Sequence, residues 1–179
     1  MAAPTKPQKV TANGKDSWFF APAVANMATP TATEINAVTG LNISCFLLAE
    51  QEGVTGTAEK VRLARLLCET STTEGLGEQT WSLADIQGVF DPQAAVAADG
   101  KKAFEKFRNG AEGYLIRRQG VKADSSTSEV TAGQFVDVFK VEIGKATPGK
   151  TSTGSDAIYS FTAPVALLAH EFNVAATGT

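Results

Sequence analysis

One amphipathic helical segment, set in a chain otherwise patterned for strands, constrains the fold most strongly. Residues 99–109 read Asp-Gly-Lys-Lys-Ala-Phe-Glu-Lys-Phe-Arg-Asn, and Gly110 follows them. The segment begins with a preferred N-cap residue type, and Ala103, Phe104 and Phe107 recur at the spacing of one helix face. A glycine is expected just past a helix end. Because so short a helix cannot bury its apolar face alone, we predict that these three side chains pack on a sheet.

Strand patterns occupy most of the remaining chain. The clearest covers residues 134–143, where apolar residues alternate over two faces as in a half-buried strand. Residues 61–69 also carry helical propensity, but we predict a strand there because the partner segment 41–49 is one. The fold class is therefore predicted as mainly β, with one flanking helix over about 99–109. The other predicted strands cover residues 80–90, 114–118, 158–163 and 164–173, and the aromatic segment 17–20 could start a sheet or dock on a neighbour.

The predicted strands 41–49 and 61–69 are separated by a polar, glycine-containing segment at residues 50–60. We expect this segment to be the tip of a long hairpin. Residues 1–16 are rich in Pro, Thr and Lys and are predicted to form a mobile arm, and residues 174–179 a loose tail. No linker divides the 179 residues, so a single domain is predicted.

Charge and hydropathy exclude two classes of function. The net charge of −3 and the pI near 5.2 argue against a protein that binds nucleic acid by neutralising phosphates. No apolar run reaches the roughly 18 residues that a membrane-spanning helix needs. Residues 1–16 hold no apolar core of a secretory signal, so we expect a soluble protein made in a cytoplasm. Cys45 and Cys68 lie in apolar segments and are predicted as buried free thiols, in preference to a disulfide.

Residues Gly144 to Thr151 match the phosphate-loop pattern G-x-x-x-x-G-K-[ST] and follow a predicted strand. The pattern binds phosphate because the loop opens a helix whose N-terminal N–H groups face the anion. Here turn residues follow the loop, and only 28 residues remain after Thr151. An ordinary hairpin loop is therefore the favoured interpretation, and a small nucleotide-binding enzyme the disfavoured one.

No other arrangement of residues predicts catalysis, a metal site or a cofactor. His170 is the only histidine and has no second ligand at metal-site spacing, so a structural or surface role is favoured. Arg117 and Arg118 could bind an anion, although a salt bridge at a strand end is the more ordinary reading. Carboxylates are spread singly, which favours solvation over an acid–base pair.

Several segments, in this order and spacing, resemble the major tail tube proteins of long, non-contractile-tailed (siphovirus-type) bacteriophages, especially the actinobacterial-phage group. Trp18 precedes a proline-bearing loop, and the run Gly-Ala-Glu-Gly-Tyr-Leu-Ile-Arg-Arg-Gln-Gly occupies residues 110–120. The resemblance spans Trp18 to Val174. Its other segments are residues 33–37, 91–93, 133–134 and 161–164.

The resemblance implies a β-sandwich or half-open barrel whose copies close into homohexameric rings. The rings would stack into a hollow tube in the virion, assembled in the host cytoplasm. Its implied partners are the tape-measure protein, tail terminator or adaptor proteins, and genomic DNA that passes without specific binding. The arms at both chain ends would reach neighbouring subunits, and the 50–60 loop would contact the next ring. The implied contact residues of that loop are Glu50, Gln51, Glu52, Thr55, Glu59 and Lys60.

Two alternatives to a tail tube subunit stay open. A related ring-former, such as a tail completion protein or a secretion-tube subunit, would share the fold. The nucleotide-binding enzyme would depend on Lys150 in the phosphate-loop pattern.

Overall fold

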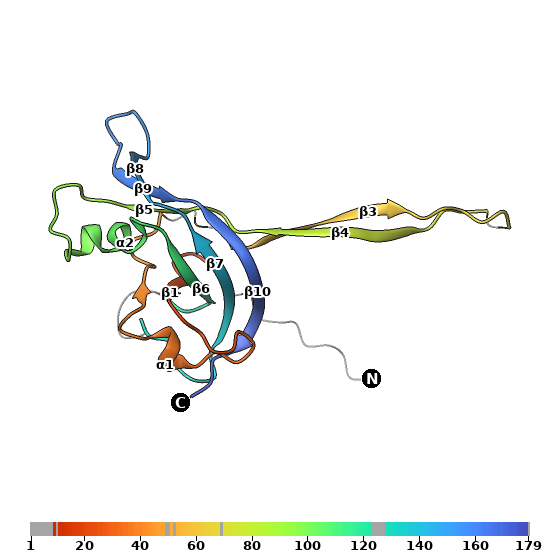
Figure 1. The fold of residues 1–179 in the computed structure, drawn as a ribbon, viewed down its shortest axis with the longest axis horizontal. Coiled ribbons are helices and arrows are strands. Elements are labelled where there is room, and N and C mark those ends of the chain that lie inside the picture. Colours follow the sequence, from red (N-terminus) through yellow and green to blue (C-terminus); the bar gives the residue numbers. More distant parts are fainter. Residues whose placement is uncertain are drawn as a thin grey trace.

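The computed structural model describes residues 9, 11–48, 51, 53–68, 70–122 and 128–178. Within these residues the chain is mainly β, as predicted, with two short helices (Figure 1). The elements in chain order are β1 (Asp16–Ala21), α1 (Ala32–Ile35), β2 (Leu41–Asn42), β3 (Thr55–Arg62), β4 (Glu74–Ser82), β5 (Ile86–Val89), α2 (Asp99–Phe107), β6 (Ala111–Gln119), β7 (Phe135–Ile143), β8 (Thr147–Lys150), β9 (Tyr159–Ala163) and β10 (Val165–Ala175).

Two antiparallel sheets form the body of the molecule, and among the described residues neither closes on itself. The larger has the order β10-β7-β6-β1-β2, and the smaller has the order β5-β9-β8. They share one bent ribbon, because β7 continues through Gly144 into β8 while β9 continues through Pro164 into β10. At the bend the N–H of Gly144 donates to the carbonyl of Pro164 (2.8 Å). The β3–β4 hairpin projects away from this body (Figure 1).

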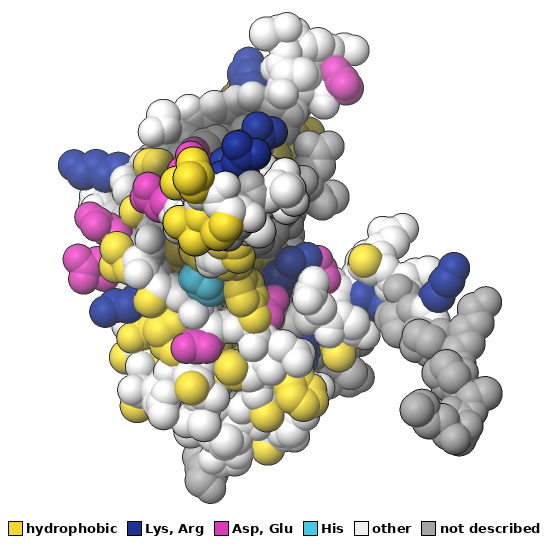
Figure 2. Space-filling view, turned by 90° about the vertical axis from the view of Figure 1, so that its right-hand side faces the viewer, with side chains coloured by type: hydrophobic (Ala, Val, Ile, Leu, Met, Phe, Trp, Pro, Cys, Tyr) yellow, Lys and Arg dark blue, Asp and Glu magenta, His cyan; other side chains and the backbone are white. Residues whose placement is uncertain are grey.

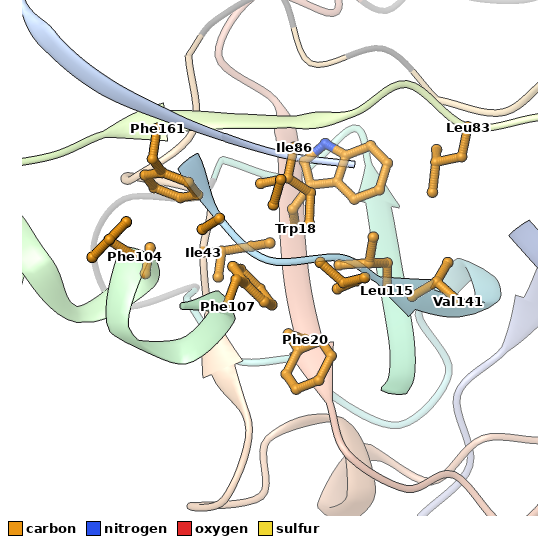
Figure 3. Close-up of a cluster of buried hydrophobic side chains, with 14 of the residues drawn as sticks. Trp18, Phe20, Ile43, Leu83, Ile86, Phe104, Phe107, Leu115, Val141 and Phe161 are labelled. Atoms are coloured by element: carbon orange, nitrogen blue, oxygen red, sulfur yellow. The ribbon is translucent and has the colours of Figure 1, made fainter. Parts of the chain in front are cut away.

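Aromatic side chains fill the space between the two sheets and α2. Phe107 meets Phe20 of β1 edge-to-face at 5.3 Å between ring centroids, and Phe104 lies 6.0 Å from Phe161 of β9 (Figure 3). Phe90 covers the outer side of Phe104 at 4.3 Å. The buried residues of α2 are Ala103, Phe104 and Phe107, the three residues of the predicted stripe.

The opposite face of the large sheet is also buried, by α1 and the chain ends near it. Val136 and Val138 of β7 pack there with Ile35 of α1 and with Ala176. The alternation of β7 therefore separates two cores, because Phe139, Val141 and Ile143 belong to the aromatic one.

A capping box starts α1. The hydroxyl of Thr31 accepts from the N–H of Glu34 (3.2 Å), and the Glu34 carboxylate accepts from the N–H of Thr31 (2.9 Å) and of Ala25 (2.9 Å). These backbone hydrogen bonds, first from Thr31 and then from Ala25, lower the pKa of Glu34.

The end of α2 follows the sequence pattern, whereas its start does not. Gly110 has φ +81°, and a Cβ there would lie 2.9 Å from the carbonyl oxygen of Ile143. The N-cap residue is Ala98, which offers no side-chain cap, and Asp99 is instead the first helical residue. Its carboxylate forms an ion pair with Lys102 at 3.0 Å, where it also faces the positive end of the helix dipole.

Three predicted strands differ from the structure. Within 41–49 only Leu41–Asn42 is a strand of the large sheet, because Asn42 accepts from the N–H of Ser44 (3.1 Å) and turns the chain. Residues 46–48 then run beside β5, bonding Gln87 and Val89. The predicted strand 61–69 holds only for Val61 and Arg62, where β3 ends, and β3 pairs with β4 rather than with residues 41–49; residue 69 lies outside the described residues. The predicted strand 80–90 is two strands separated by residues 83–85.

The chain ends are only partly described. The predicted arm over 1–16 falls largely outside the described residues, and its last residue, Asp16, begins β1. The predicted loose tail is wrong for residues 174–177. Val174 and Ala175 end β10, Ala176 is buried, and the N–H of Thr177 donates to the carbonyl of Pro30 (2.8 Å). Burying an alanine and pairing this backbone fixes the segment beside α1.

Candidate assembly surfaces

The β3–β4 hairpin is an arm that holds its shape without a core of its own. All eight residues of β3 are exposed. The two strands pair from Thr55↔Ser82 to Arg62↔Glu74, and the N–H of Leu63 donates to the carbonyl of Thr73 (2.9 Å). Facing hydroxyls add two rungs near the base, Thr55–Ser82 at 3.1 Å and Thr57–Thr80 at 2.8 Å. Cross-strand pairs of this kind are what stabilises an isolated hairpin.

The two faces of the hairpin differ in chemistry towards its end. Val61 lies against Gly77, and a Cβ added to Gly77 would lie 2.7 Å from the Cγ2 atom of Val61. Leu63 lies over Gly75 in the same way. Glycines on β4 thus leave room for an apolar ridge formed by Val61 of β3 and by Leu63, which follows the strand. On the other face Arg62 stands opposite Glu74. The exposed apolar face formed by Val61 and Leu63 is typical of an interaction surface.

The base of the hairpin rests on β10 through an aromatic cluster. The ring of Trp81 lies 4.6 Å from that of His170 and 5.7 Å from that of Phe172. Gly56, which pairs with Trp81 across the hairpin, lies beneath the indole, so that a Cβ there would overlap it. Figure 2 shows the histidine among hydrophobic side chains on the face from which the hairpin projects. His170 is thus a packing residue in this structure.

The structure corrects the predicted hairpin tip. Three of the six proposed contact residues, Thr55, Glu59 and Lys60, lie within β3, and Glu50 and Glu52 fall outside the described residues. Gln51 lies beside the body, where it donates to the carbonyl of Ala84 (3.4 Å) and accepts from the N–H of Gln87 (3.3 Å). The strands of the hairpin pair as far as Arg62↔Glu74, so the chain reverses beyond Arg62, further along than residues 50–60. The role of the six proposed residues in a contact between rings stays a prediction.

The edge of the large sheet offers a second surface. In the described part of the chain β10 pairs only with β7, so one side of its 11 residues carries no strand. Two register shifts bend the strand, and at the second Asn173 adopts φ +52° while its N–H donates to Asp137 (2.9 Å). β8 is likewise the outer strand of the smaller sheet. An uncovered edge is a template for a strand of another chain.

The two adjacent arginines of β6 have different environments. Arg117 forms an ion pair with Asp16 (2.5 Å), as the salt-bridge interpretation expected. Arg118 is fully buried and donates to the carbonyl of Glu129 (2.7 Å) and to the side chain of Gln134 (3.1 Å). Burial lowers the pKa of Arg118. This group joins β1 and β6 to the segment before β7 and is not placed to receive an exposed anion.

The chemical motifs do not assemble into a catalytic site among the described residues. Residues 147–150 of the phosphate-loop pattern are the strand β8, and the chain turns after Thr151 without entering a helix. No group of three His, Cys, Asp or Glu side chains is placed to hold a metal ion in this part of the chain. Neither helix there has the length and apolar character needed to cross a membrane.

The cysteines differ from the prediction. Cys45 and Cys68 are free, but both are exposed rather than buried. Cys45 occupies the turn after β2, where Ile43 is the buried residue instead. Cys68 lies in the turn of the projecting hairpin, which has no interior.

The family model of the phage tail tube protein family matches residues 3–177, nearly the whole chain. The chain belongs to this family. This tail tube protein is also similar, at 8% identity and a TM-score of 0.48, to a chain in a structure described as "Cryo-EM structure of the anti-feeding prophage (AFP) baseplate, 6-fold symmetrised". That match covers 97% of this chain and 98% of the other. No curated protein matches the chain.

Family membership confirms the predicted function at the level of a structural subunit of the tail tube, and it places the protein in the virion. The surfaces that sequence reasoning missed are the hairpin end at residues 63–73 and the aromatic contact at its base. One signal could have found the hairpin: Gly75 and Gly77 are spaced by two, as expected on one face of a strand that faces bulky side chains.

Proposed function

We propose that six copies of this tail tube protein close into a ring, and that stacked rings form a hollow tube through which DNA leaves the capsid. The observation that carries the proposal is the uncovered edge of β10 in a subunit whose sheets are not closed. A long edge strand invites pairing with a neighbour, and pairing around a closed ring removes every such edge.

The hairpin supports the second part of the proposal. Stacking needs a contact that leaves the plane of the ring, and the β3–β4 hairpin projects well beyond the body (Figure 1). Its turn, which follows Arg62, is proposed as a contact with the next ring in addition to the contact residues predicted in the 50–60 segment. The arm over residues 1–16 is proposed to reach a neighbouring subunit. Each subunit is proposed to be a single domain.

The net charge of −3 supports passage of DNA without retention, because like charges keep phosphates from adhering to the wall. The proposed partners are the tape-measure protein inside the tube and the terminator or adaptor proteins at its ends, with assembly in the host cytoplasm. No catalytic role is proposed, since the family is structural. A long, non-contractile tail of the actinobacterial-phage group is proposed from the motif order, and a tail sheath gene beside this one would contradict it.

The purified full-length chain, imaged by negative-stain microscopy and weighed by mass photometry, tests the proposal. Six-subunit particles and hollow tubes are expected as the concentration rises. A species that stays strictly monomeric at high concentration, with and without its tail partners, would contradict it.

A further inference from the structure

A second apolar surface lies at the end of the molecule opposite the hairpin. It is a groove of about 410 Å³ between the start of α2, the end of β5 and the start of β9. Phe90, Pro92, Ile158 and Tyr159 line it, and Ile158 and Tyr159 are 47% and 53% exposed. In Figure 1, α2 and the β8–β9 end lie on one side of the body and the hairpin points to the other. The groove therefore needs a cover that its own hairpin cannot supply.

The end of the hairpin carries large apolar side chains. Leu63 is 52% exposed, Leu67 is 108% exposed, and Leu76 of β4 is 69% exposed. An eight-residue strand holds this end roughly 25 Å from the base, at about 3.3 Å per residue. Leaving several such side chains in water is costly in an isolated subunit, and burial against an apolar groove would recover about 25 cal/mol per Å².

Charge gives the contact a direction. Asp91 lines the groove and accepts from the N–H of Gln93 (2.9 Å), and within the described residues it forms no ion pair. The hairpin end carries Arg62 and Arg65, neither of which forms an ion pair in the same part of the chain. A carboxylate at the rim of one surface and arginines on the other favour a single orientation of docking.

Resting on the proposed tube, we propose that the hairpin end of one copy docks in the α2–β9 groove of another copy. Leu63 and Leu67 cover Ile158 and Tyr159, and Arg65 faces Asp91. The two surfaces lie at opposite ends of one molecule, so the contact is head-to-tail and repeats from copy to copy without limit. A contact of this type extends a tube rather than closing a pair.

Disulfide trapping tests the contact directly, because Cys68 already lies at the hairpin end. In a full-length Cys45→Ser background, Ile158→Cys places a second thiol in the groove. A disulfide needs Cβ atoms about 3.5–4.5 Å apart, so oxidation of assembled tubes reports close approach. A ladder of covalent dimers, trimers and longer species is expected on a non-reducing gel.

Two matched variants control the trap. Val38→Cys in the same background places a thiol on another fully exposed side chain, outside the groove, and should give no ladder. Adding Cys68→Ser to the Ile158→Cys variant should abolish the ladder. Tubes that form but do not cross-link through Ile158→Cys would overturn the docking contact and leave the tube intact. Wild-type protein that forms no tubes would overturn the proposed function itself.

Charge reversal tests the orientation. Arg65→Asp or Asp91→Arg alone should lower the yield of sedimentable tubes by about tenfold or more, and the double variant should restore most of it. Unchanged melting of the unassembled variants shows that they fold. A double variant no better than the singles would overturn the Arg65–Asp91 pairing. Tubes in which a different tail protein occupies the groove would overturn the hairpin as its occupant.

Discussion

Replacing Phe107 by alanine tests whether α2 holds the two sheets together. The side chain is fully buried and meets Phe20 edge-to-face at 5.3 Å. The backbone at this residue is used as well, because its carbonyl accepts from the N–H of Gly110 (3.0 Å) and of Ala146 (3.0 Å). A neighbouring side chain cannot fill the space without moving α2 or β1, so a cavity should remain.

Phe→Ala in such a core lowers the free energy of unfolding by about 3–5 kcal/mol. That is a large part of the roughly 5–15 kcal/mol by which domains are stable. At about 2–4 °C per kcal/mol for a chain of this size, the melting temperature should fall by roughly 6–20 °C. Phe107→Asp should prevent folding, because it places an uncompensated charge in the core.

Circular dichroism of the unassembled subunit measures both effects. Phe135→Ala is the matched control, since Phe135 lies in β7 but is 57% exposed. It should change the unfolding free energy by less than about 1 kcal/mol. A Phe107→Ala variant that melts within about 2 °C of the wild type would refute the packing of α2 described here.

Three further variants test the hairpin base, the bend in β10 and the cap of α1. Trp81→Ala should leave the melting of the body unchanged, yet speed hydrogen exchange in the hairpin, because the contact with His170 is lost. Asn173→Val should lower the unfolding free energy by about 1–2 kcal/mol in urea, because φ is +52°, whereas Asn173→Gly should be nearly neutral. The pKa of Glu34 is lowered from 4.5 on folding, so its contribution to stability is present above that pH and is lost as the pH falls below it. The stability difference between wild type and Glu34→Gln should therefore narrow in acid, and a difference that widens would contradict the cap.

Elements that bury a patterned face could be predicted from the sequence. The stripe in α2 and the alternation of β7 both record which side meets a core, and both elements lie within one or two residues of their predicted bounds. The faces of β7 proved to serve two cores, which the alternation alone does not reveal.

The hairpin could not be placed in this way, because no part of it is buried in a core. The apolar residues from Val61 onwards predict one strand of a packed pair, and the polar residues before them predict a loop. In the structure the polar Thr55 and Thr57 are in the strand, where hydroxyl rungs take the place of core packing. The prediction that Cys68 is buried is wrong for the same reason, because its apolar neighbours lie on the projecting hairpin and not in a core.

The pairing of β10 is the centre of this account, and a cryo-electron microscopy reconstruction of the assembled tube measures it most directly. We expect a strand of the neighbouring subunit to run along the outer edge of β10, so that each ring contains a continuous sheet. A tube in which that edge faces solvent, or in which subunits touch only through loops, would contradict it.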